Sequence, residues 1–189
     1  ASVTVNIDTT VPVVAYEHIP AANPAGWNNS DVTVKFTCAD PLSGMASCPA
    51  DIILSSNGVN ISAAATAYDL AGNSVETTVS GINIDRALPV STASVSGTPE
   101  NGYYGSPVAV TILSTDTVSG VAKTFYSLDG GDIAEYQSPV EVSAEGHHTV
   151  RHYALDKAGN QEAEQTLEFN IDVTAPVVSY TIIPPACRT

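Results

Sequence analysis

The sequence is poor in basic residues and contains no long hydrophobic run. It has six Lys and Arg residues against 20 Asp and Glu residues, which gives a formal net charge of −14. Nucleic acids and anionic membranes are bound by clustered Lys and Arg, so we expect neither as a partner. No apolar stretch approaches the roughly 20 residues that a helix needs to cross a bilayer. The acidity fits either a solvated secreted surface or the binding of cations.

Recognisable catalytic motifs are also missing. The sequence has no nucleophile elbow, no Gly-rich phosphate loop, and no His/Cys or His/Ser pair with an orienting group. Its Asp and Glu residues cluster in predicted turns and junctions rather than around one cleft, which disfavours a glycosidase pair. We therefore expect that the protein is not an enzyme.

Cysteine is scarce, with three residues in the chain. Cys38 and Cys48 flank a short loop without a Cys or His cluster nearby, which predicts a disulfide rather than a zinc site, although two free thiols remain an alternative. A disulfide implies an oxidising, extracytoplasmic location. Cys187 is then a free thiol, an intermolecular partner or half of another pair. His148 and His152 would lie ~13 Å apart along one strand, too far for a shared ion.

The sequence does contain a motif that occurs three times. Asn-Ile-Asp, three further residues and a proline lie in residues 6–14, 83–90 and 170–178, at a spacing of roughly 80 residues. Each copy ends a run of alternating apolar and polar residues, and a new run begins after the proline. A period of this length suits a whole small β-domain and is too long for one turn of a solenoid. We interpret the motif as a junction between domains.

The motif divides the chain into two complete repeats and two fragments. The repeats are residues 9–85 and 86–172. Residues 1–8 match the last strand of a repeat, and residues 173–189 begin like the first strand of a repeat. The chain is therefore either part of a longer array or a subunit that its neighbours complete.

Both repeats have the pattern of short β-strands. Residues 31–38 alternate, with Val32, Val34 and Phe36 on one side. No segment is predicted to be helical, because even the alanine-rich residues 63–67 have β-branched neighbours. Seven or so short strands per repeat, with frequent turns, predict an all-β fold of two tandem Ig-like antiparallel β-sandwiches, with an orphan strand at each end.

The junction motif and two turn motifs together resemble bacterial Ig-like repeats, the modules of long secreted adhesins and cell-surface proteins. The turn motifs are Asp-x-x-Ser-Gly at residues 40–44 and 116–120, and Asp-x-Ala-Gly-Asn at residues 69–73 and 156–160. The resemblance covers nearly the whole chain, although Arg86-Ala87-Leu88 replaces the usual Thr-Thr-Ala at the second junction. It implies an extracellular spacer, and in repeats of this kind calcium between domains stiffens the rod.

In an Ig-like sandwich, both turn motifs lie at the end where the chain enters. Three carboxylates should therefore converge there, and Ca²⁺ takes six to eight oxygen ligands in flexible geometry. We predict a Ca²⁺ site at each entry, although the same sequences also form turns that cap their own backbone without a metal. The predicted ligands are Asp8, Asp40, Asp69 and Asn73 in the first repeat and Asp85, Asp116, Asp156 and Asn160 in the second.

The sequence leaves three functions open. The first is a structural spacer or stalk of an extracellular bacterial protein, with adjacent Ig-like repeats as partners. The second is a filament of identical subunits, in which residues 1–8 are donated to a neighbour as a strand. The third is a carbohydrate-binding accessory module for a glycan or host-surface ligand, with Tyr126 and Tyr136 beside the hairpin turn at residues 129–132 as the ligand platform.

Overall fold

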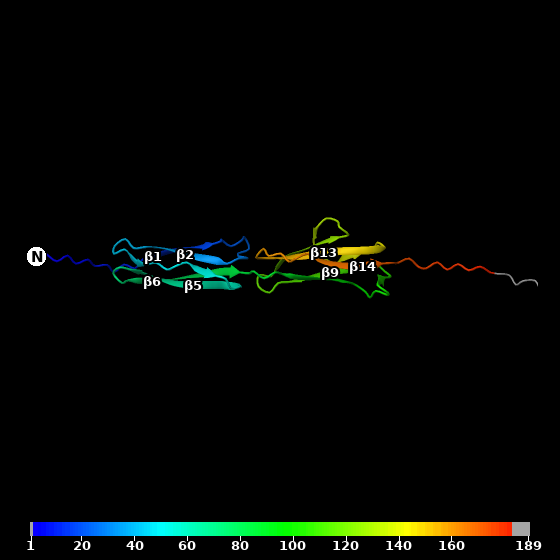
Figure 1. Ribbon diagram of the computed structural model, residues 1–189, viewed down its shortest axis with the longest axis horizontal. Helices are drawn as coiled ribbons and strands as arrows, with labels where there is room; N and C mark the ends of the chain where they lie inside the picture. Colours follow the sequence, from blue (N-terminus) through cyan, green and yellow to red (C-terminus); the bar gives the residue numbers. More distant parts are fainter. Residues whose placement is uncertain (1, 183–189) are drawn as a thin grey trace, which may run out of the picture.

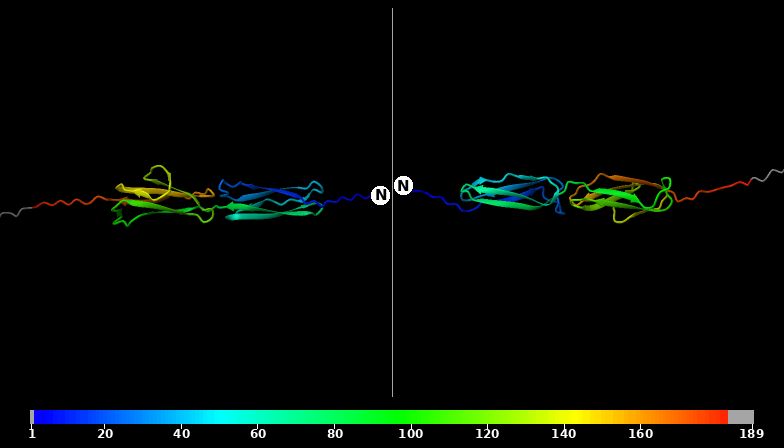
Figure 2. Two further views of the ribbon diagram at one scale, coloured as in Figure 1. Left: turned by 180° about the vertical axis from the view of Figure 1, so that it is seen from behind. Right: turned by 90° about the horizontal axis from the view of Figure 1, so that it is seen from below.

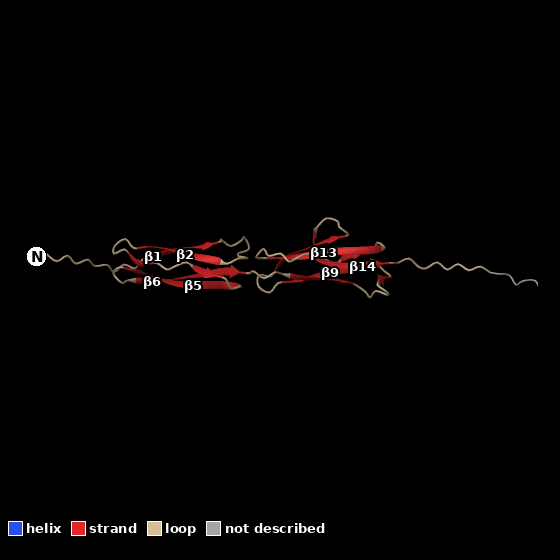
Figure 3. Cartoon of the chain, viewed as in Figure 1, coloured by secondary structure: helices blue, strands red, loops and turns tan. Residues whose placement is uncertain are grey.

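The computed structural model describes residues 2–182 of the chain. Two β-sandwiches lie end to end in it, and an extended segment leaves each outer end (Figures 1 and 2). Strands are the regular elements of this part of the chain, and no helix occurs in it (Figure 3). Accordingly, none of its segments forms a helix with the length and apolar character needed to span a bilayer. The predicted all-β fold of two tandem Ig-like sandwiches is confirmed.

The first sandwich, called domain 1 below, consists of two three-stranded antiparallel sheets. One sheet has the order β1-β2-β4 and the other the order β3-β5-β6. The alanine-rich residues 63–67 lie within β5, as the sequence predicted. The strands are β1 Val13–Ile19, β2 Val32–Ala39, β3 Met45–Ser47, β4 Ile52–Leu54, β5 Gly58–Asp69 and β6 Ser74–Ile84.

The second sandwich, domain 2, has a three-stranded sheet β12-β9-β7 and a five-stranded sheet β11-β10-β13-β14-β8. All pairings are antiparallel except that of the short β8 with β14. The strands are β7 Val90–Val95, β8 Tyr103–Tyr104, β9 Val108–Thr115, β10 Val121–Leu128, β11 Ala134–Glu135, β12 Val140–Val142, β13 Gly146–Asp156 and β14 Gln165–Ile171.

Each sandwich has a hydrophobic core of its own. Alternate residues of a strand point to opposite faces, so one face of each sheet supplies the core. In domain 1 the core residues are Val32, Val34 and Phe36 of β2 and Val79, Ile82 and Ile84 of β6. In domain 2 they are Val108, Val110, Ile112, Val142, Val150, Phe169 and Ile171. The two clusters share no residue, so the described chain holds two separately packed cores.

The extended segments at the two ends have no strand partner in the described chain. Residues 2–12 and 172–182 form no strand, because a strand requires a neighbour that accepts and donates its backbone hydrogen bonds. The isoleucine of the repeated motif shows the consequence. Ile84 and Ile171 are 0% and 1% exposed in their cores, whereas Ile7 is 80% exposed. Residues 2–8 therefore carry the apolar side of a last strand without a sandwich to bury it.

Candidate metal centres at the sandwich ends

Two acidic clusters lie where the chain enters the sandwiches: Asp8, Asp40 and Asp69 in domain 1, and Asp85, Asp116 and Asp156 in domain 2. The first member of each cluster is the aspartate of the Asn-Ile-Asp motif. Asp8 accepts the N–H of Thr10 at Oδ1 (2.9 Å) and the N–H of Ser43 at Oδ2 (3.0 Å). Hydrogen bonding from Ser43, and then from the Thr10 N–H, lowers the pKa of Asp8 below its ordinary value, so this carboxylate is ionised at neutral pH. In domain 2, Asp85 likewise accepts the N–H of Ala87 at Oδ1 and the N–H of Ser119 at Oδ2, both at 2.9 Å.

Asp85 connects the two sandwiches. The residue before it, Ile84, is fully buried in the core of domain 1, and the N–H of Asp85 donates to the carbonyl of Asn28 in domain 1 at 2.8 Å. Its carboxylate instead accepts the N–H of Ser119 in domain 2 at 2.9 Å. A cation bound to the Asp85 carboxylate would therefore tie the end of domain 1 directly to domain 2.

The second member of each cluster is the aspartate of the Asp-x-x-Ser-Gly turn. Asp40 accepts three backbone N–H groups at Oδ1, from Leu42, Ser43 and Gly44, at 3.1, 2.9 and 2.9 Å. Gly44 has a φ of 83°, which is strained for any residue with a Cβ atom. The other oxygen, Asp40 Oδ2, is buried and has no hydrogen-bond partner. In domain 2, Asp116 accepts from Val118 and Gly120 at 3.1 and 2.7 Å.

The third member is the aspartate of the Asp-x-Ala-Gly-Asn turn. Asp69 accepts the N–H of Asn73 at Oδ1 and the side-chain Nδ2 of Asn73 at Oδ2, both at 2.8 Å. Asn73 Nδ2 also donates to the carbonyls of Asp8 (3.2 Å) and Thr10 (3.1 Å). Domain 2 repeats this arrangement. Asp156 accepts the N–H of Asn160 at Oδ1 (2.8 Å) and the side-chain Nδ2 of Asn160 at Oδ2 (2.7 Å), and Asn160 Nδ2 also donates to the carbonyl of Asp85 (2.9 Å).

These contacts differ from the amide-oxygen ligands that we expected from Asn73 and Asn160. The amide nitrogen of each asparagine faces its cluster, because it donates to a carboxylate and to a carbonyl of the entering chain. Each asparagine thus orients the aspartate of its turn and fixes the entering chain. The carboxylates are left as the side-chain oxygens available to an ion.

The structure brings the predicted aspartates together in two groups of three. Within each group, one carboxylate oxygen per residue lies within 4.8 Å of the others. The groups are Asp8, Asp40 and Asp69 at the entry of domain 1, and Asp85, Asp116 and Asp156 at the entry of domain 2. The members of each group come from the entering chain and two separate turns, so only the folded sandwich assembles them.

Burial makes this concentration of negative charge unusual. Asp69, Asp85 and Asp156 are 2%, 0% and 1% exposed. None of the ion pairs in the described residues involves an aspartate of either cluster. Burying carboxylates beside each other without a positive partner is costly, since desolvation and like-charge repulsion act together. A bound cation would offset both penalties by its attraction to the carboxylates.

The donor set fits a hard divalent cation. Each cluster offers carboxylate oxygens and no sulfur or imidazole nitrogen. All-oxygen coordination of six to eight ligands is typical of Ca²⁺, whereas zinc favours Cys and His. Three carboxylates would supply at least three of these oxygens, and backbone carbonyls or water would have to supply the rest. The residues present therefore suit Ca²⁺.

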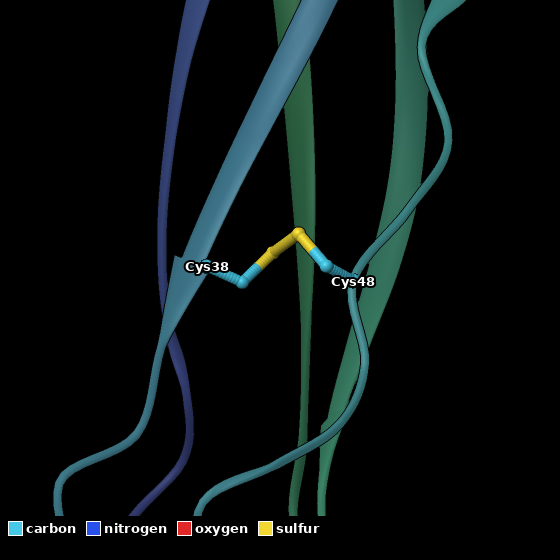
Figure 4. Close-up of a disulfide and its surroundings, with 2 residues drawn as sticks. All are labelled: Cys38 and Cys48. Carbon is cyan, nitrogen blue, oxygen red and sulfur yellow. A yellow bond between two sulfur atoms is a disulfide. The ribbon is translucent and has the colours of Figure 1, made fainter.

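The predicted disulfide is present in domain 1. Cys38, near the end of β2, is bonded to Cys48, just after β3, with a Cα–Cα distance of 5.7 Å (Figure 4). Because β2 and β3 belong to different sheets, the bond links the two layers of the sandwich beside the Asp40 turn. The third cysteine, Cys187, lies outside the described residues.

The two tyrosines that we considered as a ligand platform lie at the edge of the domain 2 core. Tyr126 and Tyr136 pack edge to face, with ring centroids 6.2 Å apart. Both are half-buried and packed against the hydrophobic cluster of domain 2. Their rings are thus largely used in packing, and they do not form a pair of exposed parallel faces.

The buried histidines of domain 2 have protein partners. His148 Nδ1 lies 2.8 Å from Asp129 Oδ2, and its Nε2 lies 2.8 Å from the carbonyl of Ala144. Burial alone would lower the pKa of His148, but the hydrogen bonds to Asp129 and Ala144 raise it overall. His152 Nδ1 lies 2.7 Å from Ser91 Oγ, and burial lowers the pKa of His152. Neither histidine belongs to an acidic cluster.

Two contacts at the junction have no signal in the sequence. Arg86, directly after Asp85, pairs with Asp31 of domain 1 at 2.6 Å and also donates to the carbonyl of Ser55. Asn23 Nδ2 of domain 1 donates to the carbonyl of Lys157 in domain 2 at 2.9 Å. These contacts join residues far apart in the sequence, so only the folded arrangement reveals them. They hold the linker on domain 1 and add a direct contact between the sandwiches.

Comparisons with known proteins give little further guidance. No protein-family model matches the sequence, and no curated protein matches it. Among solved structures, the chain is similar to fibronectin(III)-like modules of Clostridium thermocellum CbhA, with 14% sequence identity and a TM-score of 0.37. That match covers 89% of this chain and 100% of the other. The fold assignment therefore depends on the observed sheets, and membership of the bacterial Ig-like family stays a prediction.

Proposed function

We propose that the chain is a spacer segment of an extracellular bacterial surface or adhesin-type protein, stiffened by Ca²⁺ between its domains. One observation carries the proposal: an acidic cluster lies where one sandwich is joined to the next, and Asp85 contributes to both sides of that junction. A spacer needs domains that stack end to end at a fixed angle. The stacked arrangement of the two sandwiches supports this role (Figure 1).

The proposed stiffening follows from the origin of the three carboxylates. Asp85 is the last residue before the linker, while Asp116 and Asp156 belong to turns of domain 2. An ion held by all three fixes the linker to domain 2, and Arg86 already holds the linker to domain 1 through Asp31. Rotation about the linker then requires loss of a ligand. Without the ion, mutual repulsion of the carboxylates favours separation of the two ends.

The disulfide supports the extracellular location in this proposal. Disulfides form and persist in oxidising compartments and are rare in the cytosol. The Cys38–Cys48 bond joins two sheets of one small sandwich, the position at which a cross-link compensates for a modest core. We propose no nucleic-acid or anionic-membrane partner, because the chain has few basic residues to bind one.

Adjacent Ig-like repeats are the proposed partners. In this scheme, residues 9–85 and 86–172 are the complete repeats, residues 1–8 are the last strand of a preceding repeat, and residues 173–189 begin a following one. The exposed Ile7, equivalent to the buried Ile84 and Ile171, supports this assignment, since an apolar strand face is normally covered. We assign no catalytic role to either sandwich.

Strand donation between identical subunits receives less support. A donated strand needs a sandwich whose last strand is missing, and residues 1–8 would have to fill that place. In both sandwiches the place is already taken, by β6 in domain 1 and by β14 in domain 2. A carbohydrate-binding role likewise lacks exposed aromatic faces at Tyr126 and Tyr136. The spacer is therefore the preferred function.

Small-angle X-ray scattering of the full chain with Ca²⁺ and with a chelator tests this function. With Ca²⁺ we expect one extended shape, and chelation is expected to shorten the maximum dimension and broaden the distance distribution. Far-UV circular dichroism should stay unchanged, because each sandwich keeps its own core. Adding Ca²⁺ back should restore the first profile. Identical scattering in both solutions would contradict the stiffening role.

A further inference from the structure

The two sandwiches close the same loop by different chemistry. In domain 1, Cys38 precedes the turn aspartate by two residues and Cys48 follows the turn glycine by four. The residues at these positions in domain 2 are Ser114 and Thr124. Thr124 Oγ1 donates to Ser114 Oγ at 2.7 Å. A disulfide in one domain thus stands where a hydroxyl–hydroxyl hydrogen bond stands in the other.

Both bridges connect the two sheets of their sandwich at the acidic end. Cys38 and Ser114 lie near the ends of β2 and β9, in one sheet of each domain. Cys48 directly follows β3, and Thr124 lies in β10, in the other sheet. Each bridge therefore closes the base of the loop that carries the Asp-x-x-Ser-Gly turn, residues 38–48 in domain 1 and 114–124 in domain 2.

The closed loop of domain 1 supplies or contacts two carboxylates of its cluster and binds the backbone of the turn that carries the third. It carries Asp40 itself, and the N–H of Ser43 binds the Asp8 carboxylate at 3.0 Å. The carbonyl of Gly44 accepts the N–H of Leu70 at 2.9 Å, which fixes the turn that begins at Asp69. Displacement of this loop would therefore disturb every aspartate of the cluster at once.

We propose that the Cys38–Cys48 disulfide is a positioning element of the domain 1 cation site, and that its reduction weakens Ca²⁺ binding there while the domain 2 site is unaffected. This inference rests on the proposed function, since it assumes that both clusters bind Ca²⁺. A covalent bridge keeps the loop in its binding geometry in the absence of the ion, which lowers the cost of assembling the site. The Ser114–Thr124 hydrogen bond has no sulfur and does not respond to a reductant.

The inference is tested by measuring each site separately in the full chain. In Asp156→Asn the domain 1 cluster is the intact one, so the variant measures Ca²⁺ binding at that site. In Asp69→Asn the domain 2 cluster is the intact one. Calorimetric titration with Ca²⁺ is carried out on each protein before and after reduction, and mass spectrometry verifies that the disulfide is open. Cys48 is exposed to solvent, so a reductant can reach the bond. Reduction is expected to weaken binding about tenfold in Asp156→Asn, or about 1.4 kcal/mol, and to leave Asp69→Asn unchanged.

Two pairs of substitutions separate the bridge from the cysteines that form it. In the Asp156→Asn background, Cys38→Ala with Cys48→Ala should reproduce the weak binding of the reduced protein. Cys38→Ser with Cys48→Thr copies the domain 2 bridge. This pair should recover part of the Ca²⁺ affinity, and its affinity should not change when reductant is added. Fluorescence of Trp27, the one tryptophan in the sequence, verifies that domain 1 remains folded in each variant.

The outcomes distinguish this inference from the function on which it rests. Unchanged Ca²⁺ affinity of Asp156→Asn after complete reduction, or full affinity in the alanine pair, would overturn the positioning role and leave the spacer intact. Equal weakening of both sites by reductant would also overturn it, because domain 2 has no disulfide. Lack of Ca²⁺ binding by the oxidised wild-type chain would overturn both proposals.

Discussion

Replacing Asp156 by asparagine is expected to weaken Ca²⁺ binding at the junction by roughly 100-fold, or about 2.8 kcal/mol. The substitution keeps the size of the side chain but removes one of the three negative charges of the cluster. Calcium affinity depends strongly on the number of charged ligands. Calorimetric titration of the full chain, with the domain 1 cluster removed by Asp69→Asn in both proteins, measures the change at the junction alone.

The same substitution distinguishes a metal ligand from a residue that only caps a turn. At a free Ca²⁺ concentration about 100 times the Kd, the bound ion would stabilise the native state by about 2.7 kcal/mol. Asp156→Asn should therefore lower the Tm of domain 2 in Ca²⁺. In chelator we expect little change, because removal of one repelling charge offsets the loss of one hydrogen-bond acceptor.

Asp172→Asn is the matched control for this prediction. Asp172 occupies the same motif and accepts the N–H of Thr174 at 3.0 Å, as Asp8 and Asp85 accept theirs. In the described part of the chain, Asp172 belongs to neither acidic cluster. Its substitution should leave Ca²⁺ affinity unchanged. Equal losses of Tm with and without Ca²⁺ in Asp156→Asn would instead identify the aspartate as a turn residue only.

Replacing Ile84 by alanine is expected to destabilise domain 1 by about 2–5 kcal/mol and to leave domain 2 folded. Ile84 is fully buried among Val32, Val34 and Phe36, so the deletion leaves a cavity. Small domains are stable by only about 5–15 kcal/mol, so the loss is a large part of the total. Trp27 fluorescence during urea unfolding reports domain 1, and hydrogen exchange followed by mass spectrometry reports domain 2.

The repeated motif provides two controls for this prediction. Ile171→Ala should destabilise domain 2 and leave the Trp27 signal unchanged, because Ile171 lies in the other core. Ile7→Ala should change stability by less than about 0.5 kcal/mol, since Ile7 is 80% exposed. Simultaneous unfolding of both domains in Ile84→Ala would show that the sandwiches share one cooperative core.

The features that follow from repetition could be predicted from the sequence. The three copies of the Asn-Ile-Asp motif indicated tandem domains, and the alternation in residues 31–38 identified the long inner strand β2. The grouping of Asp8, Asp40 and Asp69 followed from one rule of topology, that certain turns of an Ig-like sandwich lie at the end where the chain enters. Each of these inferences needed only local pattern and the fold class.

The remaining features depend on contacts that local pattern does not encode. The sequence presents Arg86 as a departure from the junction motif, and its role depends on Asp31, which lies far away in the chain. The orientation of the Asn73 amide is decided by the carbonyls of Asp8 and Thr10, which reach it only after folding. Ser114 and Thr124 are ordinary strand residues until their separation across the two sheets is known.

The number of Ca²⁺ ions bound by the full oxidised chain tests most directly whether the two acidic clusters are calcium sites. Equilibrium dialysis at ~5 mM free Ca²⁺, above the range of roughly 10⁻⁴–10⁻³ M typical of extracellular modules, gives this number. We expect two ions per chain, one for each acidic cluster, and one ion after Asp156→Asn. A chain that binds no Ca²⁺ under these conditions, or that still binds two ions after Asp156→Asn, would contradict this expectation.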